Sequence, residues 1–228
     1  MIEIQNVTIC FTDNIILDNI SVNFHPNQIY GIVGLNGAGK TTFFNALSAN
    51  IKVDAGHIMF NDIPISSKVI AYLETVNFFY SRITGKEYLK IFKQTNIDFN
   101  LKSLQEYFKL PLDDLIETYS TGMKKKLALL GILKKGKEIF LLDEPFNGLD
   151  MESNKVLEVI IMAIKEKGKT VFVSSHIIDP LLKVCDSIHY LDNGKFTRTF
   201  DKIDFHKIED ELFRKLMTDA KLRISRSI

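Results

Sequence analysis

One glycine-rich stretch, residues 34–42, constrains the fold more than any other part of this sequence. It reads Gly-Leu-Asn-Gly-Ala-Gly-Lys-Thr-Thr, follows an apolar run at 29–33 and precedes a run with helical spacing at 42–47. Glycines let successive backbone N–H groups turn inward toward an anion, and a following helix adds the free N–H groups of its N-terminus. This order of strand, loop and helix predicts a phosphate-binding loop in an α/β fold.

Two side chains at the end of the loop favour a nucleoside triphosphate as the ligand. Lys40 offers a mobile positive charge for the β- and γ-phosphates. The Thr41 hydroxyl is a hard oxygen ligand that suits Mg²⁺. A glycine turn that only joined a strand to a helix would not need Lys and Thr at this spacing. The sequence therefore predicts a site for a nucleoside triphosphate with bound Mg²⁺.

Composition argues against several other classes of protein. The chain has 46% apolar and 25% charged residues, as is usual for a globular protein. Its net charge of +1 gives no strong positive electrostatic potential that would attract nucleic acid. No segment approaches the roughly 18 apolar residues of a membrane span, and no secretory signal is evident. We expect a cytosolic protein that meets the membrane only through a partner. Cys10 and Cys185 are expected to be buried free thiols in a reducing compartment.

Hydrophobic periodicity predicts one domain over residues 1–228, with a parallel core sheet, an N-terminal antiparallel β layer and an inserted helical subdomain at about 77–134. Period-two alternation predicts the antiparallel layer at 2–11 and 15–24, and residues 57–60 give another strand. Core strands are predicted at 28–33, 69–73, 139–142, 170–173, 187–191 and 195–200. Helices are predicted at 87–92, 101–108, 124–133, 152–166 and 179–185, with a C-terminal helix and tail at about 204–228.

Two carboxylates follow the apolar strand at 139–142. Because the carboxyl ends of parallel strands meet at one edge of a sheet, we expect Asp143 to lie beside the glycine loop and to hold Mg²⁺ through water. Glu144 points elsewhere and could act as a general base on the attacking water. His176 ends the next core strand at the same edge, where it could hydrogen-bond the γ-phosphate.

A polar loop at 119–123, Tyr-Ser-Thr-Gly-Met, opens the helix predicted at 124–133. Ser120 or Thr121 could cap this helix, and the helix N-terminus could also bind an anion. The run Lys124, Lys125 and Lys126 is interpreted as one solvated helix face and not as a nucleic-acid patch.

Taken together, these motifs resemble the nucleotide-binding subunits of ABC (ATP-binding cassette) transporters, which are P-loop NTPases. The resemblance spans residues 2–200, with Walker A at 34–42, Walker B at 139–143 and a D-loop at 148–150. The family's LSGGQ signature corresponds to residues 119–123 and differs from it at three of five positions. Similar Tyr-Ser-x-Gly-Met signatures occur in the exporter-like subfamily that handles drugs, peptides and polysaccharides.

The resemblance implies an ATPase whose two subunits, identical or not, face head to tail, with each ATP held between Walker A of one chain and the signature of the other. Lys40, Glu144 and His176 would be the catalytic residues. A membrane permease would be the partner, gripped by the helical subdomain and the loop before it. The residues implied in ATP binding are Phe11, which would stack on adenine, with Gly34, Leu35, Asn36, Gly37, Ala38, Gly39, Lys40, Thr41, Thr42, Ser120, Thr121, Gly122, Met123 and Asp150.

One position departs from the family. A glutamine usually follows the strand at 69–73 and reaches the metal or the attacking water, but Thr75 stands there, with Glu74 before it. Thr75 is shorter than glutamine, whereas Glu74 has the length and adds an anionic oxygen that Mg²⁺ accepts. We expect Glu74 or Thr75 to join Thr41 and Asp143 in the metal shell. A solvated role for Glu74 stays open.

Three other classes share part of this pattern. A P-loop kinase or GTPase would have Walker A and B, but no reason to carry the loop at 119–123, Glu144 and His176 together. An ABC protein of DNA repair or the ribosome usually needs two cassettes or a coiled-coil insertion. A nucleotide sensor without turnover would not need Glu144 and His176.

Overall fold

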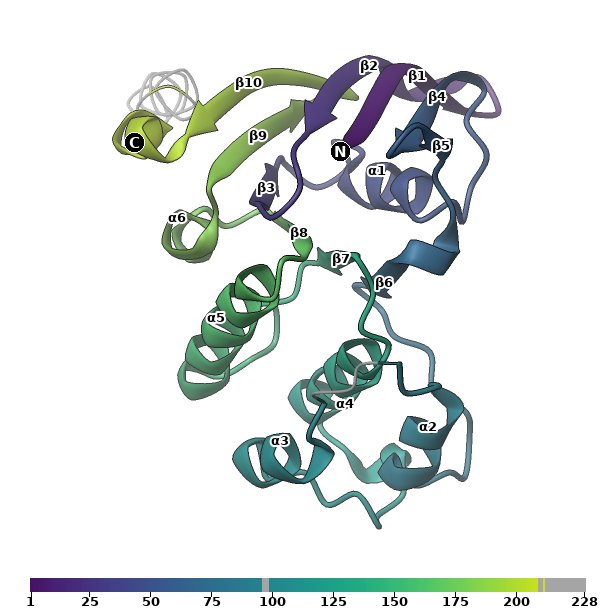
Figure 1. The fold of residues 1–228 in the computed structure, drawn as a ribbon, viewed down its shortest axis with the longest axis vertical. Helices are drawn as coiled ribbons and strands as arrows, with labels where there is room; N and C mark the ends of the chain where they lie inside the picture. The colour runs from purple at the N-terminus through teal and green to yellow at the C-terminus, as the bar shows by residue number, and fades with distance from the viewer. Residues whose placement is uncertain (96–98, 209–210, 212–228) are drawn as a thin grey trace, which may run out of the picture.

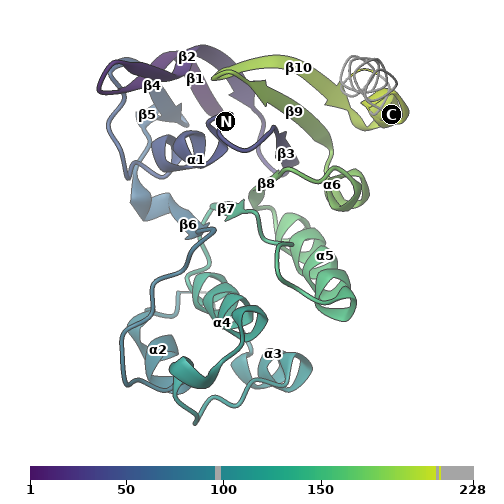
Figure 2. The ribbon, with the colours of Figure 1, turned by 180° about the vertical axis from the view of Figure 1, so that it is seen from behind.

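The computed structural model describes residues 1–95, 99–208 and 211, and these form two sheets with helices around them. The sheets and the first helix lie in the upper part of the molecule in Figure 1, and the helices of residues 85–134 lie in the lower part. Seen from behind in Figure 2, the same two parts are joined through β6 (Ile70–Leu73) and β7 (Ile139–Asp143). The predicted α/β class with an inserted helical subdomain is confirmed.

The first sheet is antiparallel and has the strand order β2-β1-β4-β5. Its strands are β1 (Ile2–Phe11), β2 (Asn14–Phe24), β4 (Ala55–Phe60) and β5 (Ile63–Pro64). Alternate residues such as Ile2 and Ile4 are buried, as period-two patterning requires, and Ile4 pairs with Val22. The predicted N-terminal β layer is therefore confirmed. The two-residue strand β5 was not predicted, since it is too short to show a periodicity.

The core sheet has the order β10-β9-β3-β8-β7-β6. Its strands are β3 (Ile29–Val33), β6 (Ile70–Leu73), β7 (Ile139–Asp143), β8 (Thr170–Ser175), β9 (Ser187–Asp192) and β10 (Lys195–Asp201). All neighbours are parallel except β9 and β10. β3, β7 and β8 are buried along their whole length, which explains their continuous apolar runs. Their carboxyl ends meet at one edge of the sheet.

Helix α1 (Lys40–Leu47) lies between the two sheets. Its buried Phe43 and Phe44 join one apolar cluster with Phe24, Phe172 and Ile4, which come from both sheets. This cluster fixes the start of α1, and with it the glycine loop, against the end of the core sheet.

The helical part contains α2 (Gly85–Ile91), α3 (Leu101–Phe108) and α4 (Thr121–Lys134), with a 3₁₀ turn at Ile116–Thr118. Thr84 and Glu87 form a capping box at the start of α2. Leu127 and Leu129 of α4 share an apolar cluster with Leu73 of β6. The helical part is therefore packed against the edge strand of the core sheet.

The remaining helices, α5 (Met151–Glu166) and α6 (Asp179–Val184), follow β7 and β8. The helix predicted from residue 204 begins differently, since the structure has a 3₁₀ helix at Lys202–Lys207, and most of the predicted helix and tail lies outside the described residues. Cys185 is buried as expected, but Cys10 is only half-buried, which corrects that prediction. None of the helices in the described ranges is long and apolar enough to cross a membrane.

Candidate functional site

The glycine loop joins the end of β3 to the start of α1. Gly39 is the N-cap of α1 with φ 105°, a left-handed conformation that side chains rarely adopt. A Cβ atom at Gly34 would lie 2.4 Å from the carbonyl oxygen of Leu191, so the loop fits against β9 only with glycine there. These two positions explain why the loop needs glycine at its contact with β9 and at the start of α1.

Lys40 lies inside this loop and is 7% exposed. Its Nζ donates hydrogen bonds to the carbonyl oxygens of Gly34 at 2.8 Å and Leu35 at 3.3 Å. The same nitrogen lies 3.4 Å from Glu144 Oε1. The predicted phosphate-binding cation and the predicted base therefore meet at the edge of the sheet.

Hydrogen bonds between side-chain oxygen atoms connect α1 to β7 and β8. The Thr41 hydroxyl donates to Asp143 Oδ2 at 2.8 Å. The Ser174 hydroxyl donates to Asp143 Oδ1 and accepts the backbone N–H of Glu144 at 2.8 Å. Asp143 and Ser174 are fully buried. A hydroxyl and a carboxylate at this spacing are the hard oxygen donors that Mg²⁺ prefers, so the residues fit the expected ion.

Sequence reasoning overlooked the role of Ser174, although one signal was present. Asp143 and Ser174 are register partners in neighbouring parallel strands. Register partners in adjacent strands project their side chains from the same face of the sheet, so two polar partners at the ends of buried strands can form a hydrogen bond.

Glu144 has a strained backbone with φ 49°, immediately before Pro145. A non-glycine residue in this region is uncommon, and such outliers cluster at functional sites. Its Oε2 lies 2.9 Å from His176 Nδ1 and accepts a hydrogen bond from Asn147 Nδ2 at 3.3 Å. The structure thus brings Lys40, Glu144 and His176 together as predicted, and it adds Asn147.

These groups open onto a cavity of about 520 Å³. Its lining combines predicted residues with Ile16 and Asn147, which were not predicted. Phe11 is half exposed at this cavity, as adenine stacking would require. Thr75 lines the cavity, whereas Glu74 does not. The lining residues are Phe11, Ile16, Asn36, Gly37, Gly39, Lys40, Thr41, Thr42, Thr75, Glu144, Asn147 and His176.

The loop at 119–123 lies away from the 520 Å³ cavity, at the start of α4. Ser120 caps α4, because its Oγ accepts the N–H of Met123 at 3.2 Å. Asp150 caps α5 by accepting the N–H of Ser153 at 2.7 Å, and this bond lowers the pKa of the Asp150 carboxyl. Within the described part of the chain, neither residue lines the 520 Å³ cavity, nor do Thr121, Gly122 and Met123.

Lys125 corrects the interpretation of the lysine run as a solvated face. It is only 7% exposed, although Lys124 and Lys126 are half-buried. Its Nζ donates to the carbonyl oxygens of Glu144 at 2.8 Å and Asn147 at 2.6 Å. Burial lowers the pKa of Lys125, and the neighbouring Glu144 and Asp143 oppose this shift.

A larger cavity of about 750 Å³ lies between α3, α5 and the end of α4. It is bordered by Phe140, near the start of β7, and by Lys169, just before β8. It therefore opens near the amino ends of the core strands, at the opposite edge of the sheet from the glycine loop. Ligand chemistry in parallel sheets gathers at the carboxyl ends, where the smaller cavity lies.

Comparisons with known proteins agree with this geometry. A family model described as ABC transporter matches residues 17–147. The chain is 27% identical to the ABC transporter ATP-binding protein YtrB of Bacillus subtilis (strain 168), covering 98% of this chain and 80% of that protein. It is 25% identical to the bacitracin transport ATP-binding protein BcrA of Enterococcus faecalis, covering 97% of this chain and 76% of that protein.

Solved structures show the same fold. One described as the ATP-binding subunit of an ABC transporter has a TM-score of 0.83 at 22% identity and covers 95% of this chain and 99% of its own. A second, the dimeric post-hydrolysis state of the ATP-binding cassette MJ0796 bound to ADP and Pi, has a TM-score of 0.76 at 20% identity. It covers 89% of this chain and 99% of its own. The chain belongs to the ABC transporter family and is an ATP-binding, ATP-hydrolysing subunit of that family.

Proposed function

We propose that this chain, acting as one domain over residues 1–228, binds ATP with Mg²⁺ and uses its hydrolysis to drive a separate membrane permease. The observation that carries this proposal is the meeting of Lys40, Thr41, Asp143 and Glu144 at one end of the core sheet. In this arrangement the glycine loop holds the phosphates, and Thr41 and Asp143 hold Mg²⁺. The ion supplies positive charge that polarises the γ-phosphate.

The hydrolytic step follows from the positions of three side chains. Glu144 accepts a proton from a water molecule whose oxygen attacks the γ-phosphorus, and the bond to the β–γ bridging oxygen breaks. Lys40 and His176 place positive charge or donor groups beside the equatorial oxygens, where negative charge develops. Glu144 lies 3.4 Å from Lys40 and 2.9 Å from His176, so the three side chains gather where the γ-phosphate is proposed to bind.

Two chains are proposed to share each ATP. Ser120 and Gly122 lie away from the cavity of their own chain, at the start of α4. A head-to-tail dimer would bring the start of α4 from one chain to the glycine loop of the other. The free N–H groups there suit an anionic phosphate. Phe11 would then stack on the adenine.

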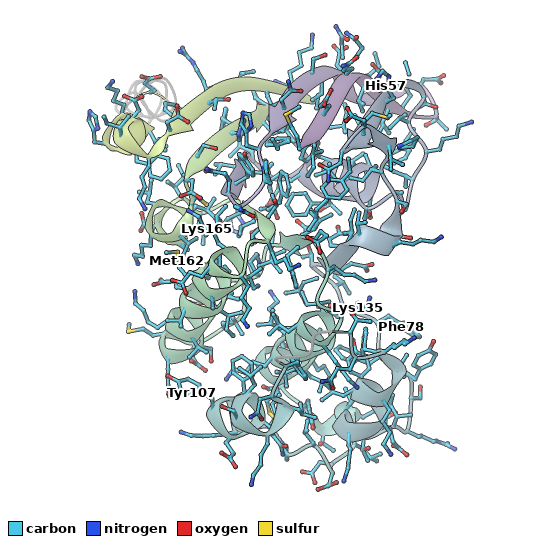
Figure 3. All side chains as sticks on the ribbon, in the orientation of Figure 1. His57, Phe78, Tyr107, Lys135, Met162 and Lys165 are labelled. Atoms are coloured by element: carbon cyan, nitrogen blue, oxygen red, sulfur yellow. The ribbon has the colours of Figure 1, made fainter. Side chains whose placement is uncertain are left out.

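The permease is proposed to dock on the segment between β6 and α2. Val76 is 82%, Phe78 72% and Tyr80 56% exposed, and the Phe78 and Tyr80 rings meet edge to face with centroids 5.1 Å apart. Figure 3 shows Phe78 at the outer margin of the helical part. Exposed aromatic residues of this kind are typical anchors of protein interfaces. The chain would thus work at the cytoplasmic face of the membrane.

The substrate is proposed to be a drug, a peptide or a similar compound moved outward. The support is the name of the relative BcrA, a bacitracin transport protein, and the Tyr-Ser-Thr-Gly-Met loop at 119–123.

Mixing two inactive variants tests the shared site. Lys40→Ala removes the phosphate-binding cation, and Ser120→Arg blocks the start of α4. A mixed dimer holds one site with both lesions and one with neither, so ATP turnover is expected to recover partly on mixing. Turnover that stays at the level of the separate variants, with mixed dimers present by crosslinking, contradicts the shared site.

A further inference from the structure

The buried charged residues of the described chain form one small group. Buried Lys, Arg, Asp and Glu side chains in the described ranges are Lys40, Lys125, Asp143 and Glu144. Three of these belong to the ATP site as predicted from the sequence. Lys125 belongs to α4, in the helical part. Burying a charge is costly unless it is paired and hydrogen-bonded, so its position calls for a specific reason.

Lys125 holds the turn that carries Glu144. Its Nζ bridges the carbonyl oxygens of Glu144 and Asn147, the first and last residues of the turn. The Asn147 N–H also donates to the Glu144 carbonyl at 3.2 Å. Because Glu144 has φ 49°, the turn is strained, and strain of this kind persists only where surrounding contacts hold it. The Lys125 ammonium supplies two such contacts.

The same helix begins at the loop expected to meet the second ATP. Ser120 caps α4 only five positions before Lys125. A Cβ atom on Gly122 would lie 3.3 Å from the carbonyl oxygen of Gly148, so the first turn of α4 also packs closely on the chain that follows Asn147. Helix α4 therefore touches the turn at 144–147 through Lys125 and the residue that follows this turn through Gly122.

We propose that Lys125 is a positioning residue for ATP hydrolysis, which fixes the turn at 144–147 so that the Glu144 carboxylate faces the attacking water. This inference rests on the proposed role of Glu144 as the base. Movement of α4 would then displace Glu144 through the Lys125 ammonium. The position of the helical part would in this way determine the position of Glu144, and therefore the rate of hydrolysis.

A double-mutant cycle tests whether Lys125 acts through Glu144. Lys125→Met keeps an unbranched side chain as far as Cε but removes the ammonium. We expect kcat to fall by about 10–100-fold, because small misplacements of a catalytic group cost up to about 10²-fold, while KM for ATP changes by less than about threefold. In the Glu144→Gln background, the same substitution should lower single-turnover hydrolysis by less than about threefold, since the base is already absent.

Lys134 offers a matched control in the same helix. Its Nζ donates to the carbonyl oxygen of Leu89 at 2.9 Å, away from the catalytic turn. Lys134→Met should therefore keep wild-type kcat, and Lys125→Arg should recover part of the lost rate because it keeps the charge and its donors. If Lys125→Met does not fold, Lys125→Gln, which keeps a donor for one carbonyl, takes its place in the cycle.

Two results overturn the inference in different ways. Unchanged kcat in Lys125→Met, or losses that multiply fully with those of Glu144→Gln, would show that Lys125 does not act through Glu144. Wild-type turnover in the Glu144→Gln single variant would show that Glu144 is not the general base. That result would contradict both the proposed role of Glu144 and this inference.

Discussion

The Thr41 hydroxyl donates a 2.8 Å hydrogen bond to Asp143 Oδ2, joining two residues that lie 102 positions apart in the chain. Thr41 belongs to the first turn of α1, and Asp143 is the last residue of β7. Their contact fixes the glycine loop against the core sheet. It also brings two hard oxygen atoms together beside the glycine loop.

Removal of the Thr41 hydroxyl is expected to weaken the hold on Mg²⁺. Thr41→Val keeps the shape of the side chain, so the Mg²⁺ concentration for half-maximal ATP turnover should rise by about tenfold, the equivalent of about 1.4 kcal/mol. Thr75→Ala should raise it less, since Thr75 lines the cavity but its short side chain would reach the ion only through water. Titration of Mg²⁺ at a fixed concentration of ATP measures these shifts.

Glu74→Ala belongs to the same titration. A metal role for Glu74 stays a prediction, and its absence from the cavity lining favours Thr75 as the nearer ligand. Curves that superimpose for Thr41→Val and wild type would show that the Thr41 hydroxyl does not bind the ion. Curves that superimpose for both Glu74→Ala and Thr75→Ala would exclude this segment from the metal site.

Phe78→Asp is expected to weaken attachment to a co-expressed permease by at least about tenfold, because loss of an aromatic anchor typically costs more than about 1–2 kcal/mol. The melting temperature of the isolated chain should change little, since Phe78 is 72% exposed. Tyr107→Asp, at an exposed aromatic residue on α3, is the control and should keep attachment. Recovery of the chain with washed membranes measures both, and equal recovery of Phe78→Asp and wild type would move the docking surface elsewhere.

His189 is expected to make the fold sensitive to acid. It is 5% exposed among Phe24, Tyr30 and Phe196, and burial lowers its pKa from 6.5 to about 4. The unfolded chain therefore takes up a proton below pH 6.5 that the folded chain refuses until about pH 4. The free energy of unfolding should fall across this window by about 3 kcal/mol from this group alone.

Urea unfolding between pH 7.5 and pH 4 isolates this contribution. His189→Phe keeps an aromatic ring but cannot be protonated, so its stability should fall less than that of wild type over the same window. His57→Gln, at an exposed position on β4 labelled in Figure 3, should follow the wild-type curve. Parallel curves for His189→Phe and wild type would show that His189 does not carry the effect.

Local patterns predicted most of the fold. The bounds of β1 and α3 are those expected from period-two and helical spacing, because each element has one apolar face. β5 was not predicted, since two residues show no periodicity. α4 begins three residues before the predicted helix, because Thr121 to Met123 carry no apolar face of their own.

Residues of the site were predictable where a motif fixes their spacing. Lys40, Thr41, Asp143, Glu144 and His176 meet as expected, because the carboxyl ends of parallel strands share an edge. Lys125 was not predictable from the sequence. Three consecutive lysines show no preferred face, and only tertiary packing decides that the middle one reaches the carbonyl groups of another segment.

Hydrolysis of ATP by Glu144→Gln tests the central claim most directly, since Gln keeps the shape of the side chain but cannot accept the proton. Single-turnover hydrolysis should fall by about 10²–10⁴-fold, the usual contribution of a positioned general base, while ATP binding persists and the variant accumulates as an ATP-bound dimer. Glu152→Gln, at an exposed position on α5, is the control and should keep the wild-type rate. Equal rates for Glu144→Gln and wild type would contradict the account.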